Sequence, residues 1–157
     1  MKLTDFICDG AIIPELDATD RNGVIRELVE AVAKDLGLEA DVTETLVDAA
    51  IARENQGSTG FGKGVAVPHV KSKAIKKLAG GIGRSSRGID FAALDRAPVY
   101  IVFLLLSPED DPDQHLAAME NIFRHLQHDN FRRFLRQAGS HGAIQELLRE
   151  ADDAPQG

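Results

Sequence analysis

The sequence has very little cysteine: Cys8 is the single one among 157 residues. One thiol cannot form an internal disulfide or a thiolate zinc cluster, so we interpret Cys8 as an inert small apolar residue and expect a reducing compartment. Long apolar runs are also lacking. The longest, residues 99–106, is far too short to cross a bilayer, and no long apolar core follows Lys2 at the N-terminus. We therefore expect a cytoplasmic protein that is not embedded in a membrane.

Positive charge is scarce as well. The chain has 18 Lys and Arg against 25 Asp and Glu, which gives a net charge of -7 and a pI near 5.2. Nucleic-acid-binding domains normally present a basic face, so this composition argues against a nucleic-acid partner. An acidic surface suits a protein that meets a basic protein partner. One local group of lysines is interpreted as a solvated loop: Lys71, Lys73, Lys76 and Lys77.

The length of the chain predicts one domain with a real hydrophobic core. We assign residues 1–150 to this domain and expect residues 151–157 to form a disordered tail. Stretches with strand character alternate with amphipathic helical patterns, which favours layered α/β architecture over a helix bundle or a β-sandwich. The predicted fold is a three-layer α/β/α sandwich, with a small mixed sheet flanked by helices.

Four short stretches are predicted as strands, and the most apolar of them, residues 99–106, is expected to lie buried at the centre of the sheet. The stretch 78–84 contains small residues that allow close backbone approach. The four are residues 11–17, 65–67, 78–84 and 99–106. The segment 88–98 is expected to be a connection.

Capping residues mark the predicted helix ends. Thr19 or Asp20 begins a first helix that Gly37 ends, and Asp41 with Glu44 resembles a capping box at the start of a second. Further helices are expected to begin at Asp111, followed by Pro112, and at Ser140.

Residues 57–70, GSTGFGKGVAVPHV, are rich in glycine. Glycine tolerates positive φ and lets backbone N–H groups approach a ligand, so this segment can form an anion-binding nest. Ser58 and Thr59 add hydroxyl donors, and together with Gly60 they are predicted to bind phosphate. The spacing matches neither the Walker A motif nor the dinucleotide-binding motif, so a plain glycine-rich connection is the local alternative.

His69 closes this segment. Pro68 has a fixed φ and restrains Val67 to extended geometry, which places His69 at the end of a short strand with a defined direction. A neutral imidazole can attack phosphorus with one ring nitrogen while the other donates a hydrogen bond. Locally, a histidine that merely faces solvent is equally compatible with the pattern.

Other polar residues are candidates for contact with a phosphate. His115 falls in the first turn of the helix that begins near Asp111, where the backbone N–H groups favour a neutral imidazole and a nearby anion, although surface residues are common there. Arg53, at a helix C-terminus, suits either a phosphate clamp or a cation that complements the helix dipole. His125 and His128 have no acidic or thiolate companion, so no metal site is expected.

The string RENQGSTGFGKGVAVPH, residues 53–69, resembles the signature of the IIA domains of the bacterial sugar phosphotransferase system, in the fructose, mannitol and nitrogen-regulatory class. Residues 90–106 resemble the segment that leads into the family's central strand, and residues 113–116 resemble the surroundings of its second histidine. Residues 3–150 can be laid along such a domain without a large insertion.

The resemblance implies a role for each of three residues. His69 would be the phosphorylated histidine, Arg53 the phosphate-stabilising arginine, and His115 the auxiliary histidine. The phosphoryl group would arrive from the phosphohistidine of the small histidine carrier protein and leave to a cysteine of a IIB domain, with no cofactor and no metal. The family commonly has glycine after the active histidine, whereas this chain has Val70. Because a β-branched residue disfavours positive φ, we expect the turn after His69 to differ.

The biological role has three candidates. The chain has no transmembrane span and no cysteine placed like a IIB nucleophile, so we expect a IIA protein that stands alone. Residues 1–7 and 15–20 resemble the nitrogen-regulatory members, whereas residues 88–91, GIDF, resemble the fructose branch. We favour a nitrogen-regulatory phosphocarrier that binds target proteins. The alternatives are a sugar-transporter IIA component and a IIA-like binding module that is not phosphorylated, although such a module would be expected to have lost Arg53 or His69.

Overall fold

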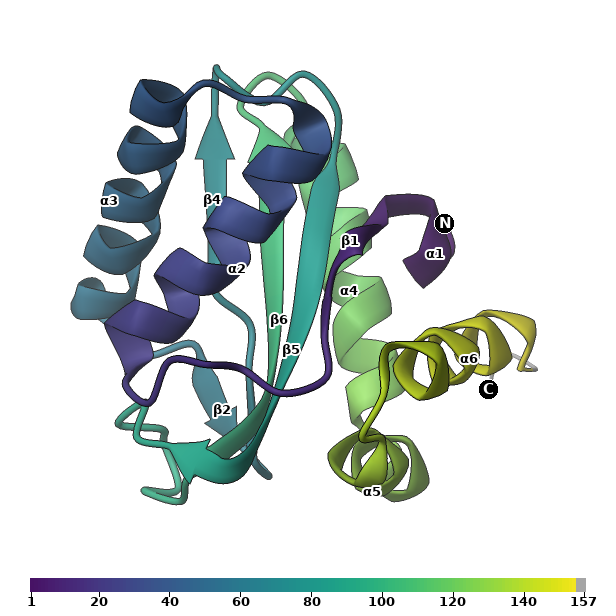
Figure 1. Ribbon diagram of the computed structural model, residues 1–157. Coiled ribbons are helices and arrows are strands. Elements are labelled where there is room, and N and C mark those ends of the chain that lie inside the picture. The colour runs from purple at the N-terminus through teal and green to yellow at the C-terminus, as the bar shows by residue number, and fades with distance from the viewer. Residues whose placement is uncertain (155–157) are drawn as a thin grey trace.

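The computed structural model describes residues 1–154, which form a six-stranded mixed sheet with helices on both faces (Figure 1). The strands are β1 (Ile7–Ile13), β2 (Gly60–Gly62), β3 (Val65–Ala66), β4 (His69–Ser72), β5 (Ala79–Ile89) and β6 (Val99–Pro108). The helices are α1 (Leu3–Phe6), α2 (Arg21–Leu36), α3 (Ala40–Gln56), α4 (Pro112–Leu126), α5 (Asp129–Gln137) and α6 (His141–Asp153). The predicted three-layer α/β/α sandwich is confirmed. Among the described residues, no helix combines the length and the apolarity needed to cross a bilayer.

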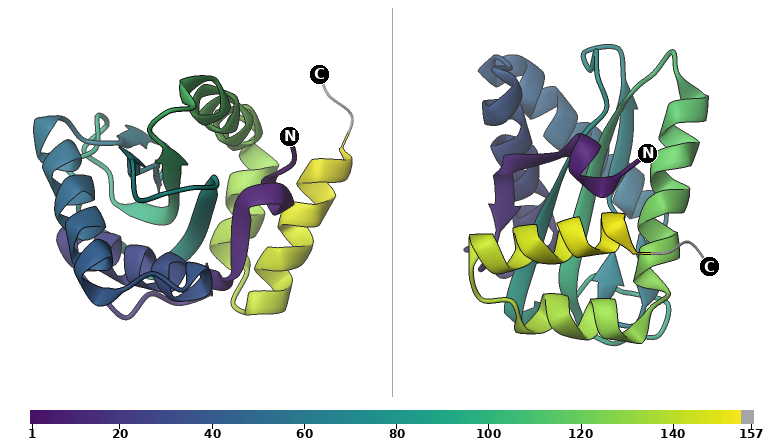
Figure 2. Two further views of the ribbon diagram at one scale, coloured as in Figure 1. Left: turned by 90° about the horizontal axis from the view of Figure 1, so that it is seen from above. Right: turned by 90° about the vertical axis from the view of Figure 1, so that its right-hand side faces the viewer.

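Strand β6 lies inside the sheet and pairs with β5 on one side and with β3 and β4 on the other. The strand order is β1-β5-β6-β3-β2, and β4 continues the line of β3 along the same edge of β6, with β3 and β4 both parallel to it. Helices α2 and α3 cover one face, and α4, α5 and α6 cover the other (Figure 2). Side chains of β6 alternate between the two cores, which explains its unbroken apolar sequence.

The first strand lies earlier in the sequence than predicted. The expected strand was residues 11–17, but β1 ends at Ile13 because Pro14 has no N–H to donate to the ladder. At its start, Ile7 pairs in parallel with Gly80 of β5. Strand β5 is also longer than expected and reaches Ile89, so the connection to β6 begins later than residue 88.

The predicted ends of α2 are confirmed. The Asp20 carboxylate accepts a hydrogen bond from the backbone N–H of Gly23 at 2.6 Å, and Gly37 ends the helix with a left-handed φ of 70°. Asp111 caps α4 and Ser140 caps α6 in the same way, through the backbone N–H groups of Gln114 and Ala143.

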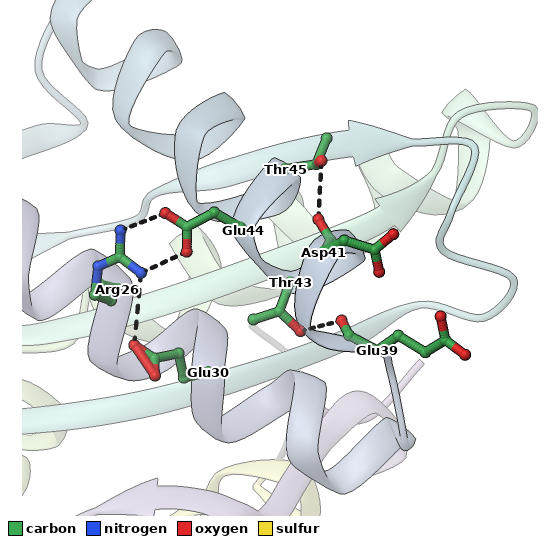
Figure 3. A network of polar contacts seen from close by, with 7 residues as sticks. All are labelled: Arg26, Glu30, Glu39, Asp41, Thr43, Glu44 and Thr45. Carbon is green, nitrogen blue, oxygen red and sulfur yellow. Dashed lines mark hydrogen bonds and ion pairs between the residues drawn. The ribbon is translucent and has the colours of Figure 1, made fainter.

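The capping box predicted for α3 is wrong. Helix α3 begins at Ala40, and no side chain caps it. The Glu44 carboxylate instead accepts two hydrogen bonds from the Arg26 guanidinium, each at 2.7 Å, which joins α3 to α2 (Figure 3). Glu44 therefore binds Arg26 of the neighbouring helix and not the backbone at the start of its own helix, because a guanidinium matches both carboxylate oxygens at once. The hydroxyl of Thr43 donates to the backbone carbonyl of Glu39 one turn earlier (Figure 3).

Helix α6 extends into the predicted tail. It runs to Asp153, so the first part of the segment 151–157 is helical, and residues 155–157 lie outside the described residues. The Asp152 carboxylate accepts hydrogen bonds from the backbone N–H groups of Leu3 and Thr4 and from the Thr4 hydroxyl, at 2.6, 3.1 and 2.7 Å. This contact ties α1 to α6, two helices that lie near each other although they come from opposite ends of the sequence (Figure 2).

Candidate active site

His69 is the first residue of β4, directly after the break that Pro68 makes in the line of β3 and β4. Pro68 donates no hydrogen bond, but its carbonyl accepts one from the backbone N–H of Leu105 at 3.0 Å, so β6 still holds the chain at this point. His69 itself lies opposite Leu105 in the parallel register. The sequence therefore places the imidazole on a fixed backbone next to the centre of the sheet.

The His69 ring has a defined tautomer. Its Nδ1 lies 2.8 Å from the carbonyl oxygen of Val67. A carbonyl can only accept, so Nδ1 carries the proton and donates, and the neutral ring keeps its lone pair on Nε2. Burial lowers the pKa of His69 below its ordinary value of 6.5, an effect that the Val67 carbonyl opposes and the positive charge of Arg53 reinforces.

His115, in the first turn of α4, faces His69. The two ring centroids are 5.6 Å apart, and His115 is only 8% exposed. Burial lowers the pKa of His115 to about 4, and repulsion from a protonated His69 and from the charge of Lys71 acts in the same direction. His115 is therefore a neutral imidazole at physiological pH.

Ser107 at the end of β6 orients this second ring. Its hydroxyl oxygen is fully buried and lies 2.6 Å from Nδ1 of His115. Within residues 1–154 the hydroxyl makes no other hydrogen bond, so both groups are satisfied when Ser107 donates to Nδ1. The proton of His115 is then on Nε2, which is the opposite tautomer to that of His69.

Arg53 lies in the last turn of α3, as predicted, beside the glycine-rich loop. One guanidinium nitrogen, Nη1, donates to the carbonyl of Gly57 at 2.8 Å, and this is its one hydrogen bond within residues 1–154. The remaining N–H groups of the guanidinium leave capacity for a further acceptor. Its charge is close enough to His69 to lower the pKa of that ring.

The three predicted phosphate-binding residues already use donor groups in hydrogen bonds within the protein. The Ser58 hydroxyl donates to the carbonyl of Phe91 at 2.7 Å and accepts from the Gly60 backbone N–H at 3.0 Å. Thr59 donates from its backbone N–H and its hydroxyl to the Glu54 carboxylate, at 2.6 and 2.7 Å. These bonds fix the loop, and phosphate contact by Ser58, Thr59 or Gly60 stays a prediction that requires them to rearrange.

A family model described as "Phosphoenolpyruvate-dependent sugar phosphotransferase system, EIIA 2" matches residues 5–151. The chain belongs to this family. It is 36% identical to a nitrogen regulatory protein of Bradyrhizobium diazoefficiens, with 94% of this chain and 95% of that protein covered. It is 30% identical to the PTS system fructose-specific EIIABC component of Bacillus subtilis, but 97% of this chain covers only 24% of that longer protein.

The fold agrees with solved structures. The nitrogen regulatory protein IIA-Ntr from Neisseria meningitidis superposes with a TM-score of 0.83 over 92% of this chain and 97% of that one, at 24% identity. EIIA proteins of this family are phosphotransferase components, so the chain is one as well.

Two residues of the site in this EIIA domain, Glu54 and Ser107, were not predicted from the sequence. Glu54 is 2% exposed and holds Thr59, and its charge slightly opposes the fall in the pKa of His69. The sequence signal for Glu54 was a carboxylate that follows Arg53 directly and precedes the Thr59 hydroxyl by five residues. Ser107 could have been noted as a hydroxyl directly after an apolar strand, although its contact with His115 depends on where α4 packs.

The residue after His69, Val70, lies in a strand and not in a turn. Val70 continues β4, pairs with Leu106 of β6 and is 7% exposed in the core under α2 and α3. The described residues with positive φ do not include it. The expected altered turn at this position is therefore replaced by an extended strand, which suits a β-branched side chain.

Proposed function

We propose that this chain is a phosphocarrier that accepts a phosphoryl group on Nε2 of His69 from the phosphohistidine of the small histidine carrier protein. The observation that carries the proposal is the hydrogen bond from Nδ1 of His69 to the Val67 carbonyl. It fixes the nucleophilic lone pair on Nε2, and the lowered pKa keeps the ring neutral and able to attack near pH 7.

The transfer is an exchange between two imidazoles. The lone pair of His69 Nε2 forms the new P–N bond while the P–N bond of the donor phosphohistidine breaks and its electrons return to the donor ring. Such a transition state is loose and carries its charge on the phosphoryl oxygens, so positioning and electrostatic stabilisation supply the catalysis. We assign these tasks to the Arg53 guanidinium and the Nε2–H of His115, with Ser58, Thr59 and Gly60 as further phosphate contacts.

Several relatives named nitrogen regulatory proteins support a downstream role in regulation. We propose a nitrogen-regulatory function in the cytoplasm, in which phosphorylation of His69 changes the binding of a target protein. The protein from Bradyrhizobium diazoefficiens named for that role covers almost the same length as this chain. The fructose-specific relative supports the second candidate, in which His69 passes its phosphoryl group to the cysteine of a IIB domain.

Intact-mass measurement tests the phosphocarrier role. Incubated with the phosphorylated carrier protein and analysed at mildly alkaline pH, where phosphohistidine survives, the wild type should gain the mass of one phosphoryl group. His69→Ala should gain none, and the surface variant His128→Ala should behave as the wild type. No gain in the wild type, or a gain that persists in His69→Ala, would contradict the proposal.

A second measurement separates regulation from transport. The isolated phosphoprotein is mixed with a fructose-type IIB domain, and loss of its phosphoryl group is followed over time. A regulatory protein should keep its phosphoryl group on the time scale on which a transport IIA loses it. Rapid, cysteine-dependent loss would favour the sugar-transport candidate.

A further inference from the structure

A cavity of about 730 Å³ lies away from His69, between the β2–β3 hairpin and α5. Its lining includes Lys63 from the hairpin, Tyr100 from β6, and Arg132, Arg133 and Arg136 from α5. Helix α4, which carries His115 in its first turn, runs from that end down to α5, so the two places lie near opposite ends of this helix (Figure 1). From the rise of an α-helix, His115 and the end of α4 are about 17 Å apart along its axis.

The cavity is positively charged on a chain whose net charge is -7. Two carboxylates also line it, those of Asp95 and Asp129. Asp129 pairs with Arg132, which leaves the charges of Lys63, Arg133 and Arg136 without an ion-pair partner among residues 1–154. Against these three cations stands the one remaining carboxylate, that of Asp95, so the lining keeps an excess of positive charge that would attract an anion.

Two of the three cations, Lys63 and Arg136, are held in place by neighbouring groups. The Asp95 carboxylate accepts a hydrogen bond from the backbone N–H of Lys63 at 3.0 Å and another from Ala97 at 3.0 Å, which ties the hairpin to the loop before β6. This tie holds Lys63 in the left-handed region, at a φ of 61°, which is unfavourable for a residue with a side chain. On the opposite wall, the Arg136 guanidinium stacks on the ring of Tyr100, with its carbon 3.7 Å from the ring centroid.

We propose that this cavity is a binding site for a phosphate-bearing small molecule. Guanidinium groups match phosphate oxygens in a bidentate geometry, and the volume lies in the range of small-molecule sites. The ligand class follows from the excess of cations over carboxylates in the lining, where Lys63 and Arg136 are held in place. The site is separate from His69, so the proposal does not depend on the phosphocarrier role. It would let a second, non-covalent phosphate ligand act on the same domain.

An NMR titration with inorganic pyrophosphate tests the site. In ¹H–¹⁵N spectra of the wild type, the amide signals of residues 62–64 and of α5 should shift and saturate, while those around His69 should move less. Arg133→Gln combined with Arg136→Gln should weaken the binding by more than about tenfold, since each charge-assisted hydrogen bond is worth roughly that factor. Parallel titrations with ADP and with a hexose bisphosphate show which scaffold the cavity prefers.

The control removes the same charge elsewhere. Lys34→Gln combined with Lys77→Gln takes two positive charges from exposed positions outside the cavity and should leave pyrophosphate affinity unchanged. Absence of saturable binding in the wild type would overturn the proposal. So would equal weakening in both double variants, shifts centred on His69, or binding of an acidic peptide but of none of the phosphates. Phosphoryl acceptance by the Arg133 and Arg136 variant should stay normal, which separates this test from that of the phosphocarrier role.

Discussion

At the scale of single residues, the two histidines of the site are made complementary by their partners. The Nδ1 of His69 meets a carbonyl, which only accepts, whereas the Nδ1 of His115 meets the Ser107 hydroxyl, which can donate. One ring therefore presents a lone pair from Nε2 and the other presents an N–H. The same type of side chain thus supplies a nucleophile at one position and a hydrogen-bond donor for a phosphoryl oxygen at the other, because the two rings have different hydrogen-bond partners.

Removal of the Ser107 hydroxyl tests this arrangement. In Ser107→Ala the Nδ1 of His115 loses its donor, so both tautomers become accessible and the Nε2–H is no longer fixed. We expect phosphoryl transfer to His69 to slow by about tenfold, the lower end of the effect of orienting partners. Rapid-quench measurement of phosphoprotein formation gives the rate. Ser85→Ala, at another buried serine whose hydroxyl accepts from Gly88, is the matched control and should transfer at the wild-type rate. An unchanged rate in Ser107→Ala would contradict the assignment.

At the scale of helices and strands, features that depend on neighbouring residues could be predicted from the sequence, whereas features that depend on tertiary contacts could not. Caps such as Asp20 and Asp111 were predictable because donor and acceptor lie three residues apart. The pairing of Glu44 with Arg26 was not, because it depends on how α2 and α3 pack. In the site, the same holds for Ser107, whose contact with His115 joins a strand end to a helix. Motif resemblance alone pointed to the facing pair of His69 and His115.

Strand β4 provides a prediction about Val70. Val70→Gly removes a buried side chain and adds backbone freedom in the extended strand that carries His69. We expect the free energy of unfolding to fall by roughly 2–4 kcal/mol, from lost burial, the cavity and glycine entropy together. Urea denaturation measures it. Lys71→Gly, at the exposed neighbouring position, should cost only about 0.5–1 kcal/mol, because it lacks the burial contribution. Equal losses in the two variants would show that the Val70 side chain contributes little.

At the scale of the whole molecule, the two ends of the chain are joined. The Asp152 carboxylate near the end of α6 caps the first backbone N–H groups of α1, those of Leu3 and Thr4. Asp152→Ala should lower the free energy of unfolding by about 1–2 kcal/mol, as for other caps, and Asp153→Ala should not. Thermal unfolding compares them. Hydrogen exchange should show faster exchange in residues 3–6 of the first variant. A wild-type melting temperature in Asp152→Ala would exclude a stabilising role for this contact.

Stability as a whole should depend on pH through the buried imidazoles. Burial lowers the pKa of His69, His115 and His125, that of His115 to about 4. Between the unfolded value of 6.5 and these lower values, the unfolded chain binds more protons than the folded protein. The free energy of unfolding therefore falls as pH drops through about 6.5 towards 4, whereas well above pH 6.5 these rings contribute no slope.

The window between pH 7 and pH 5 isolates this effect from the carboxylates. Glu44 and Asp95, whose pKa values are lowered below 4.5 and 3.8 by hydrogen bonds, lose their stabilising contribution only at more acidic pH. Urea denaturation of the wild type at pH 7, 6 and 5 should show a progressive loss of stability. His115→Gln has no titratable group at this position. Its free energy of unfolding should therefore fall less between pH 7 and pH 5 than that of the wild type, whatever its stability at pH 7. His128→Gln, at an exposed position, should keep the wild-type slope. Parallel slopes in all three proteins would mean that His115 is readily protonated in the folded state and does not serve as a neutral donor.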